Sequence, residues 1–203
     1  MAGFIRDKVI RPIYEHRARW TLRRLRAHIK STDHVLDIGA GDCRVDELLQ
    51  RKVGCQVTPV DVEDFNTTSL PLTMFDGTRL PFEDNSFDVS LVIFVLHHAQ
   101  DPRAVLAEAR RVTRRHVIVF EDVNTTTWDR WTFRSFHRLL EWSEHISRPF
   151  HEWTPEQWTA LAEELGYRED YRGLAGRQLG PLASRHVQFV WHTAKQTAVR
   201  NAA

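Results

Sequence analysis

Cysteine is scarce in this chain, which holds only Cys43 and Cys55 among its 203 residues. Two cysteines cannot build the disulfide framework of a small secreted domain, and their spacing does not suggest a zinc site. Long apolar runs are also missing, since the longest, Leu91 to Leu96, falls far short of the roughly 18 residues that cross a bilayer. No apolar stretch typical of a signal peptide opens the chain. We therefore expect a soluble cytoplasmic protein without a transmembrane segment.

An excess of charge of one sign is missing as well, because 28 Lys and Arg residues balance 27 Asp and Glu residues. That balance argues against a protein built mainly to bind polyanions. Glycine and proline contribute only 9 and 8 residues, and 42% of the chain is hydrophobic, which excludes collagen-like and disordered chains. At roughly 150 residues per domain, the length predicts a single globular domain.

The charges are nevertheless unevenly distributed. Residues 1–30 contain nine basic and two acidic residues, whereas residues 31–108 contain fourteen acidic and five basic ones. Apolar residues recur in the first segment at three- and four-residue steps, which predicts one or two amphipathic helices. The simpler interpretation is a helix that packs on the rest of the domain. The alternative is a surface for RNA or an anionic membrane, because basic amphipathic helices bind such partners.

Beyond residue 31, short apolar strands alternate with helical stretches. Strands are predicted at 35–38, 56–61, 87–94 and 116–120, and helices at 44–52 and 102–112. This alternation predicts an α/β fold, a Rossmann-like three-layer sandwich whose mostly parallel sheet is covered on both faces. Two later stretches, 168–174 and 186–192, predict a strand hairpin at the end of the sheet.

Two helix starts carry clear local signals. Asp101 followed by Pro102 is typical of an N-cap with proline at the first helical position. Thr154, with Gln157 three residues later, has the pattern of a capping box, and Gly166 ends that helix. Between these helices an aromatic-rich stretch breaks the alternation, and we interpret it as a mostly helical insertion. Its rings are Trp128, Trp131, Phe133, Phe136, Trp142, Phe150 and Trp153.

The string from Val35 to Cys43, VLDIGAGDC, carries the most functional information. It predicts an apolar strand that runs into a tight glycine turn and then into a helix. Gly39 and Gly41 let the backbone turn sharply and approach a ligand closely. The turn lies at the carboxyl ends of the parallel strands, where open sheets bind their ligands.

The charge around this turn indicates which ligand it suits. A dinucleotide site would place pyrophosphate here and would need a third glycine at position 44, where this chain has Arg44. Asp37 and Asp42 flank the turn and would repel a pyrophosphate. They suit a cationic cofactor without phosphate, such as S-adenosylmethionine. Asp61, twenty residues after Gly41, is placed to accept hydrogen bonds from ribose hydroxyls.

Asp76 and Gly77 follow another short apolar stretch. The Asp76 carboxylate could accept from the adenine amino group, while the Gly77 N–H meets a ring nitrogen. Any one of these acids alone could instead be a turn or helix cap. Because the features occur in order and at compatible spacings, together they predict a cofactor pocket.

These residues resemble the class I S-adenosylmethionine-dependent methyltransferases, and within them the type-11 branch that includes quinone-biosynthesis methyltransferases. The resemblance rests on residues 35–41, Val60-Asp61, and the run 76–88 that leads to Val95-Leu96-His97-His98. It implies S-adenosylmethionine as cofactor and S-adenosylhomocysteine as product. It also implies a seven-stranded sheet with an antiparallel C-terminal strand and a helical insertion after strand 5.

The resemblance assigns roles along the chain. The cofactor-binding residues it implies are Asp37, Gly39, Gly41, Asp61, Val62, Asp76, Gly77, Ile93 and Phe94, the last two lining the methyl-donor site. Two departures could loosen cofactor binding: Cys43 replaces the third glycine of the turn, and Pro59 precedes the ribose acid by two residues. The parts of the domain are then an N-terminal helical segment (1–30), a cofactor-binding core (33–122), a helical cap (123–166) and a C-terminal strand hairpin (167–193).

Methyl transfer from a sulfonium needs little acid–base apparatus, since alignment in a water-poor pocket supplies much of the acceleration. A base would help with a hydroxyl or acidic carbon acceptor. The candidates are His98, Glu121, His137, His145 and His151, of which His98 and Glu121 follow strands at the ligand-binding edge. Adjacent His97 and His98 point in different directions, so we expect no metal there.

The aromatic insertion suits a planar or apolar small-molecule acceptor, although each ring could instead fill a core. After the fourth strand the chain reads Ile93-Phe94-Val95-Leu96 and lacks an amine-gripping Asn-Pro-Pro-Tyr loop, so DNA is not expected. Three functions stay open: a small-molecule methyltransferase, an RNA- or lipid-directed methyltransferase, and a non-catalytic cofactor-binding protein. The sequence leaves the acceptor and the oligomeric state undetermined.

Overall fold

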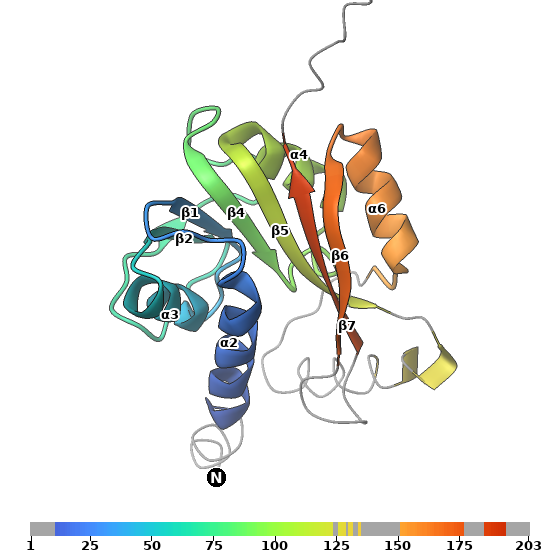
Figure 1. Cartoon of the computed structure of the whole chain (residues 1–203), viewed down its shortest axis with the longest axis horizontal. Coiled ribbons are helices and arrows are strands. Elements are labelled where there is room, and N and C mark those ends of the chain that lie inside the picture. The colour runs from blue at the N-terminus through green and yellow to red at the C-terminus, as the bar shows by residue number, and fades with distance from the viewer. Residues whose placement is uncertain are drawn as a thin grey trace, which may run out of the picture.

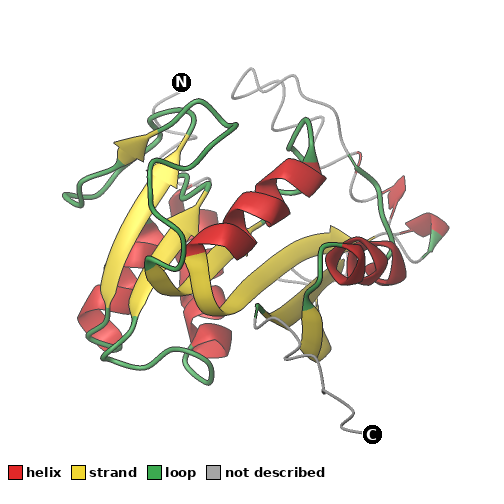
Figure 2. Cartoon of the chain, turned by 90° about the horizontal axis from the view of Figure 1, so that it is seen from above, coloured by secondary structure: helices red, strands yellow, loops and turns green. Residues whose placement is uncertain are grey.

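Figure 1 shows a computed structural model of the chain. It describes residues 11–123, 126–128, 130, 131, 134, 151–176 and 185–193. These residues form a seven-stranded sheet in the order β3-β2-β1-β4-β5-β7-β6, with helices on both faces (Figure 2). The predicted Rossmann-like three-layer fold is therefore confirmed.

All but one of the strands run in the same direction. The strands are β1 (His34–Ile38), β2 (Gln56–Asp61), β3 (Thr73–Met74), β4 (Phe87–Ile93), β5 (Thr113–Val123), β6 (Arg168–Gly176) and β7 (Arg185–His192). Strand β7 is antiparallel to both β5 and β6. This confirms the antiparallel C-terminal strand and the pairing of the last two strands. Strand β5 is longer than predicted because β7 pairs with it from His116 to Val123.

Among the described residues, two helices cover each face of the sheet. The helices are α2 (Arg11–Leu25), α3 (Arg44–Lys52), α4 (Pro102–Val112) and α6 (Pro155–Glu164). On β5, Val117 packs into the core beneath α4 and α6, whereas Ile118 packs into the core beneath α2 and α3. The central strands are apolar on both sides, and their near-continuous apolar sequence follows from this double burial.

The predicted helix boundaries agree with the hydrogen bonds. Oδ1 of Asp101 accepts from the backbone N–H of Arg103 at 2.9 Å and of Ala104 at 3.2 Å. Oε1 of Gln157 accepts from the Thr154 N–H at 2.9 Å, as a capping box requires. These caps position α4 and α6 against the sheet.

Helix α2 packs on the sheet, as the simpler interpretation of the basic segment expected. Its buried residues include Trp20 and Leu25, and Arg24 lies over the Trp20 ring and donates to the Ala175 carbonyl at 2.8 Å. Several of its basic residues, among them Arg19 and Arg23, remain exposed. A role of this face in binding RNA or lipid stays a prediction. No helix among the described residues is long and apolar enough to cross a membrane.

Most of the predicted aromatic insertion lies outside the described residues, and so do Phe133, Phe136, Trp142 and Phe150. Trp128 and Trp131 are exposed and stack with ring centroids 5.1 Å apart. Trp153 instead packs at 4.5 Å on Trp158, which is fully buried in the core. Of these three rings, two are exposed and one packs against the core, so the aromatic residues of this segment do not all fill the core.

Candidate active site at the carboxyl end of the sheet

The glycine turn follows β1 and holds three residues in the left-handed region: Gly39 (φ +76°), Gly41 (φ +56°) and Cys43 (φ +57°). The Gly39 N–H donates to the Val60 carbonyl at 2.8 Å, which ties the turn to the end of β2. A Cβ on Gly39 would lie 2.5 Å from Cγ2 of Val95, whereas a Cβ on Gly41 would meet no described atom within 4 Å. The turn is therefore closed on the Gly39 side and open beside Gly41, where a ligand has room.

Two buried carboxyl groups lie next to the turn. Asp37 on β1 is 2% exposed, and Asp46 in the first turn of α3 is 0% exposed. Apart from the other carboxyl group and the backbone of Asp46 itself, no described residue donates to either oxygen of Asp46 or to Oδ1 of Asp37. The hydrogen bond between the two side chains therefore requires a shared proton.

Burial disfavours ionisation of both carboxyl groups. It raises the pKa of Asp46 to about 7, and the pKa of Asp37 is raised by burial and by the neighbouring Asp46 carboxylate. The pair therefore keeps a proton at neutral pH. A ligand cation that reaches these oxygens could replace that proton.

The acidic flank of the turn differs from the expected pair of Asp37 and Asp42. Oδ2 of Asp42 accepts from Nε of Arg44 at 2.8 Å, and Arg44 also lies 3.6 Å from Glu15. The charge of Asp42 is thus balanced by Arg44. The carboxyl groups next to the turn that have no basic partner among the described residues are those of Asp37 and Asp46. Asp46 could not be found from the sequence, because a polar residue in a first helical turn is ordinarily solvated.

Replacing Asp46 with asparagine should change how stability depends on pH. Because the folded pKa of Asp46 is raised, the protonated pair contributes stability that is present below the unfolded value near 4 and lost as the pH rises through about 7. We expect the free energy of unfolding of Asp46→Asn to fall by roughly 4 kcal/mol less than that of the wild type between pH 4 and pH 8, because each pKa unit corresponds to about 1.4 kcal/mol. Thermal unfolding across this range measures the difference, with half-buried Glu47→Gln as the control. Parallel curves for wild type and Asp46→Asn would rule out the shared proton.

Asp61 joins the end of β2 to the turn. Its Oδ2 accepts from the Gly41 N–H at 2.8 Å, and its Oδ1 accepts from the N–H groups of Val62 at 2.7 Å and Glu63 at 3.3 Å. The carboxylate is fixed at the carboxyl edge of the sheet, directly beside the open side of the turn. Its predicted contact with ribose fits this position.

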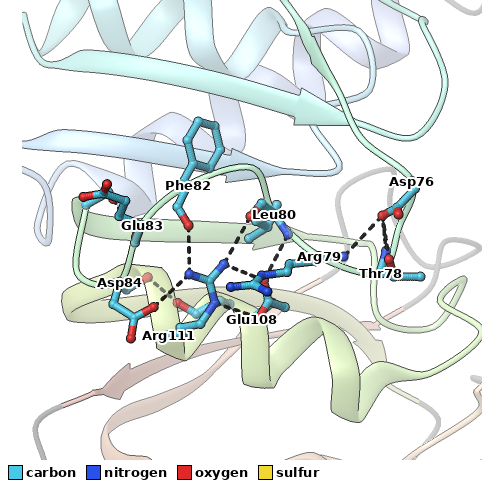
Figure 3. A network of polar contacts seen from close by, with 12 residues as sticks. Asp76, Thr78, Arg79, Leu80, Phe82, Glu83, Asp84, Glu108 and Arg111 are labelled. Carbon is cyan, nitrogen blue, oxygen red and sulfur yellow. Dashed lines mark hydrogen bonds and ion pairs between the residues drawn. The ribbon is translucent and has the colours of Figure 1, made fainter.

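Asp76 and Gly77 begin the loop that runs from β3 toward β4. Oδ1 of Asp76 accepts from the Thr78 N–H and hydroxyl and from the Arg79 N–H, so this exposed carboxylate shapes its own turn (Figure 3). A Cβ on Gly77 would lie 3.2 Å from Cγ1 of Val62. The loop after β2 and the loop after β3 therefore meet at this point, as a shared adenine pocket requires.

Arg111 on α4 holds the rest of that loop (Figure 3). Its guanidinium donates to the carbonyls of Phe82 at 2.8 Å and Leu80 at 3.1 Å, and pairs with Asp84 and Glu108. These carboxylates raise the pKa of Arg111. Next to the loop lies a small groove lined by Ile38, Phe75, Gly77, Thr78, Leu80, Val105 and Glu108.

Ile93 is the last residue of β4 and Phe94 follows it, and both are buried. Phe94 has a φ of +58°, and its N–H donates to the Phe120 carbonyl at 2.7 Å. Cζ of Arg17 lies 4.1 Å from the centre of the Phe94 ring. The left-handed Phe94 redirects the chain away from the sheet, and this turn sets where the following histidines point.

A buried cluster of acidic residues and histidines lies at the loop after β4. Its members are His97, Glu121, Asp122 and His186. Oε1 of Glu121 accepts from the Leu96 N–H at 2.7 Å, and Oε2 lies 2.5 Å from Nδ1 of His97. Nε2 of His97 lies 4.0 Å from Asp122, whose Oδ1 is 2.7 Å from Nδ1 of His186. The cluster links the ends of β4 and β5 to the start of β7.

The two carboxylates of this cluster favour the charged form of His97. Burial alone would lower the pKa of His97, but the Glu121 carboxylate, its hydrogen bond and Asp122 raise it above the ordinary histidine value. Glu121 is 0% exposed and both its oxygens are occupied, by Leu96 and His97. This arrangement argues for a positioning role of Glu121 in place of the predicted role as base.

The other predicted bases are distributed as follows. His98 is half-buried, and its ring centroid lies 4.1 Å from that of His97. The histidine that contacts Glu121 directly is His97. Nε2 of His151 lies 3.0 Å from the Ala99 carbonyl, so His151 holds the same loop. His137 and His145 lie outside the described residues.

Comparison with known proteins agrees with this geometry. Residues 36–120 match the family described as "Methyltransferase domain". This match places residues 36–120 in the type-11 family of class I S-adenosylmethionine-dependent methyltransferases. The cofactor of this methyltransferase domain is S-adenosylmethionine.

Two curated relatives carry the same description. A demethylmenaquinone methyltransferase of Streptomyces avermitilis is 37% identical over 87 residues, which are 39% of this chain and 37% of the relative. One from Mycobacterium sp. (strain KMS) is 30% identical over 157 residues, which are 71% of this chain and 65% of the relative. The chain therefore spans between 37% and 65% of the length of these two relatives.

Among solved structures, the methyltransferase fold recurs over nearly the whole chain. One neighbour comes from a complex of the Haloferax volcanii Trm112 methyltransferase activator with a methyltransferase. It has a TM-score of 0.71 and 18% sequence identity, and the match covers 95% of both chains. At this identity the likeness establishes the fold alone.

The site fits the family's cofactor on its own chemistry. Apart from each other and the backbone of Asp46, the carboxyl groups of Asp37 and Asp46 have no donor among the described residues at these oxygens, which suits a cationic group. The backbone beside Gly41 leaves open space. An acidic, open turn of this kind accommodates an ammonium and would repel a pyrophosphate.

Proposed function

We propose that this chain transfers the methyl group of S-adenosylmethionine to a small planar or apolar acceptor. The observation that carries the proposal is the acidic, open glycine turn, with Asp37 and Asp46 on one side and Asp61 on the other. The residues proposed to hold the cofactor are Asp37, Gly39, Gly41, Asp61, Val62, Asp76, Gly77, Ile93 and Phe94, to which the structure adds Asp46.

Each group has a distinct part in binding. Asp37 and Asp46 would receive the ammonium of the methionine end, because no other described side chain supplies a positive charge to their inner oxygens. Asp61 keeps acceptor capacity after its backbone contacts, since a carboxylate offers about four lone-pair sites. Its remaining sites are proposed to bind the ribose hydroxyls.

When bound, S-adenosylmethionine supplies an electrophilic methyl group. The chain's own residues then orient the acceptor and keep water out. His97 and Glu121 fix the loop after β4 through the Leu96 N–H, and so set the wall of the site next to Phe94. A positioned wall of this kind aligns the acceptor without removing a proton from it.

The functions of the two curated relatives narrow the proposed acceptor class. Both curated relatives are named demethylmenaquinone methyltransferases, which favours a planar, apolar quinone-like acceptor for this chain. The exposed, stacked pair Trp128 and Trp131 offers aromatic surface to such a ring. An RNA- or lipid-directed reaction is the second candidate, supported by the exposed arginines of α2.

Cofactor binding and turnover test the proposal in two steps. Saturating S-adenosylhomocysteine should raise the melting temperature, because the ligand binds only the folded state. Turnover is read as release of S-adenosylhomocysteine with quinone-like acceptors. The RNA- or lipid-directed alternative predicts binding that weakens steeply with added salt. Absence of any thermal shift would overturn the proposal, and a shift without turnover on any acceptor would leave a cofactor-binding protein.

Replacing Asp61 with alanine should weaken cofactor binding by about 1–3 kcal/mol, or roughly 5- to 150-fold, because charge-assisted hydrogen bonds are lost. Isothermal titration with S-adenosylhomocysteine measures the change. Asp64→Asn is a matched control in the same loop, since Asp64 is exposed and caps only Asn66. Equal affinity of Asp61→Ala and wild type would remove Asp61 from the site.

A further inference from the structure

A second cluster of potential ligands lies at the opposite end of the sheet, where β5 begins and β7 finishes (Figure 1). His116 on β5 and His192 on β7 are direct partners in the antiparallel ladder, and their ring centroids are 5.1 Å apart. Directly opposed residues project on the same face of a sheet. Neither histidine contributes to the glycine turn or to the loop after β4.

Asp170 reaches this pair from β6 through a bulge. The ladder pairs Glu169 with Trp191 and Tyr171 with Val190, which leaves Asp170 as an extra, unpaired residue of the strand. Bulges redirect side chains and often do so next to functional sites. Here Oδ2 of Asp170 lies 3.1 Å from Nε2 of His116.

The three side chains form a compact donor set. One ligand atom from each of His116, Asp170 and His192 lies within 4.8 Å of the others. Two imidazoles and one carboxylate are ligands that zinc and neighbouring divalent transition ions prefer, whereas magnesium and calcium prefer oxygen alone. Because three hydrogen-bonded strands supply one ligand each, the set is held in place before any ion arrives.

Two arginines border the cluster. Arg168 donates to Oδ1 of Asp170 at 2.9 Å, which orients the carboxylate and leaves Oδ2 toward His116. Nε of Arg115 lies 3.3 Å from Nδ1 of His116. This arginine would turn aside when the ring proton moves to Nδ1, and both arginines moderate the affinity for a cation.

We propose that His116, Asp170 and His192 form a three-ligand site for a divalent transition-metal ion, with zinc as the principal occupant. The ion replaces the hydrogen bond between His116 and Asp170 and ties β5, β6 and β7 together at the end of the sheet remote from the cofactor. It leaves room for water or a partner's side chain to complete the coordination. The site stabilises the C-terminal strands and is independent of methyl transfer.

Metal titration of the full chain, purified through a chelator, tests the site. We expect one zinc per chain in competition with a chromophoric chelator, a higher melting temperature with zinc, and no shift with magnesium. Cobalt should bind in place of zinc and show visible absorption that reports nitrogen and oxygen ligands. Neither readout depends on methyltransferase activity.

Variants locate the ion. His116→Ala, His192→Ala and Asp170→Asn should each weaken zinc binding at least about tenfold, because each removes a direct ligand. His16→Ala is the matched control, since His16 is exposed on α2 and belongs to no such cluster. Thermal stabilisation by S-adenosylhomocysteine shows that each variant is folded and that the cofactor site is intact.

Several outcomes would overturn the proposal. Equal zinc affinity of the wild type and all three variants would place the ion elsewhere, and zinc binding no tighter than magnesium binding would exclude the site. Should a variant fail to fold, protection of His116 and His192 from diethylpyrocarbonate by zinc is measured on the wild type. If zinc did not protect these histidines from modification, the proposed site would be excluded.

Discussion

Replacing Glu121 with alanine should lower the free energy of unfolding by about 3–5 kcal/mol, because it leaves His97 in a buried position without its compensating charge. The variant also leaves the Leu96 N–H without the acceptor that it has at 2.7 Å. For a protein of this length the loss corresponds to a melting temperature lower by roughly 6–20 °C. Urea unfolding of wild type and variant measures it.

The pH dependence of this effect has a definite sign. The folded pKa of His97 is raised, so the pair contributes stability that is complete below the ordinary histidine value near 6.5. That contribution is lost as the pH rises through the raised folded value. The difference between wild type and Glu121→Ala should therefore be larger at pH 6 than at pH 9.

Two controls separate charge from packing. Glu121→Gln keeps an acceptor for the Leu96 N–H and removes only the charge. At high pH it should therefore lower the free energy of unfolding by less than Glu121→Ala does. Glu163→Ala removes an exposed carboxylate on α6 and should change stability little. A cost for Glu121→Ala below about 1 kcal/mol, or one that is the same at pH 6 and pH 9, would contradict the buried ion pair.

Gly39→Ala should destabilise the fold by about 2–4 kcal/mol, because it adds a steric clash to an unfavourable backbone conformation. At a φ of +76° the new Cβ would lie 2.5 Å from Cγ2 of Val95. Val95 or the turn would have to move, and the turn forms part of the proposed cofactor site. Chemical denaturation gives the stability, and titration with S-adenosylhomocysteine should show weaker binding.

Gly41→Ala is the matched control for that clash. Gly41 also has a positive φ, of +56°, but its Cβ would meet no described atom within 4 Å. Its cost should therefore be only the backbone term, about 1–2 kcal/mol. Equal costs for the two variants would show that the contact between Gly39 and Val95 does not constrain the turn.

Much of the fold follows from local sequence signals. The alternation of short apolar strands with amphipathic stretches predicted β1, β2, β4 and β5 and the helices between them. Asp101 and Pro102 predicted the start of α4, since a cap depends on residues adjacent in the chain. Strand β3 escaped prediction because its two residues give no periodicity.

Part of the site followed from spacing as well. The glycine turn and Asp61 lie together because consecutive parallel strands end at one edge of the sheet, and Asp61 accepts directly from Gly41. The partner of Glu121 could not be read in the same way. The left-handed turn at Phe94 decides that His97, and not the adjacent His98, faces β5.

The sequence by itself determined the order of strands and helices, the glycine turn and the ends of the helices, because periodicity and capping depend on neighbours along the chain. Only the tertiary structure decided which polar groups are buried together. Asp46 meets Asp37 because α3 packs on β1, and Asp170 turns to His116 because β6 bulges where it pairs with β7. Each of these contacts joins elements separated in the sequence, and packing between such elements leaves no local pattern.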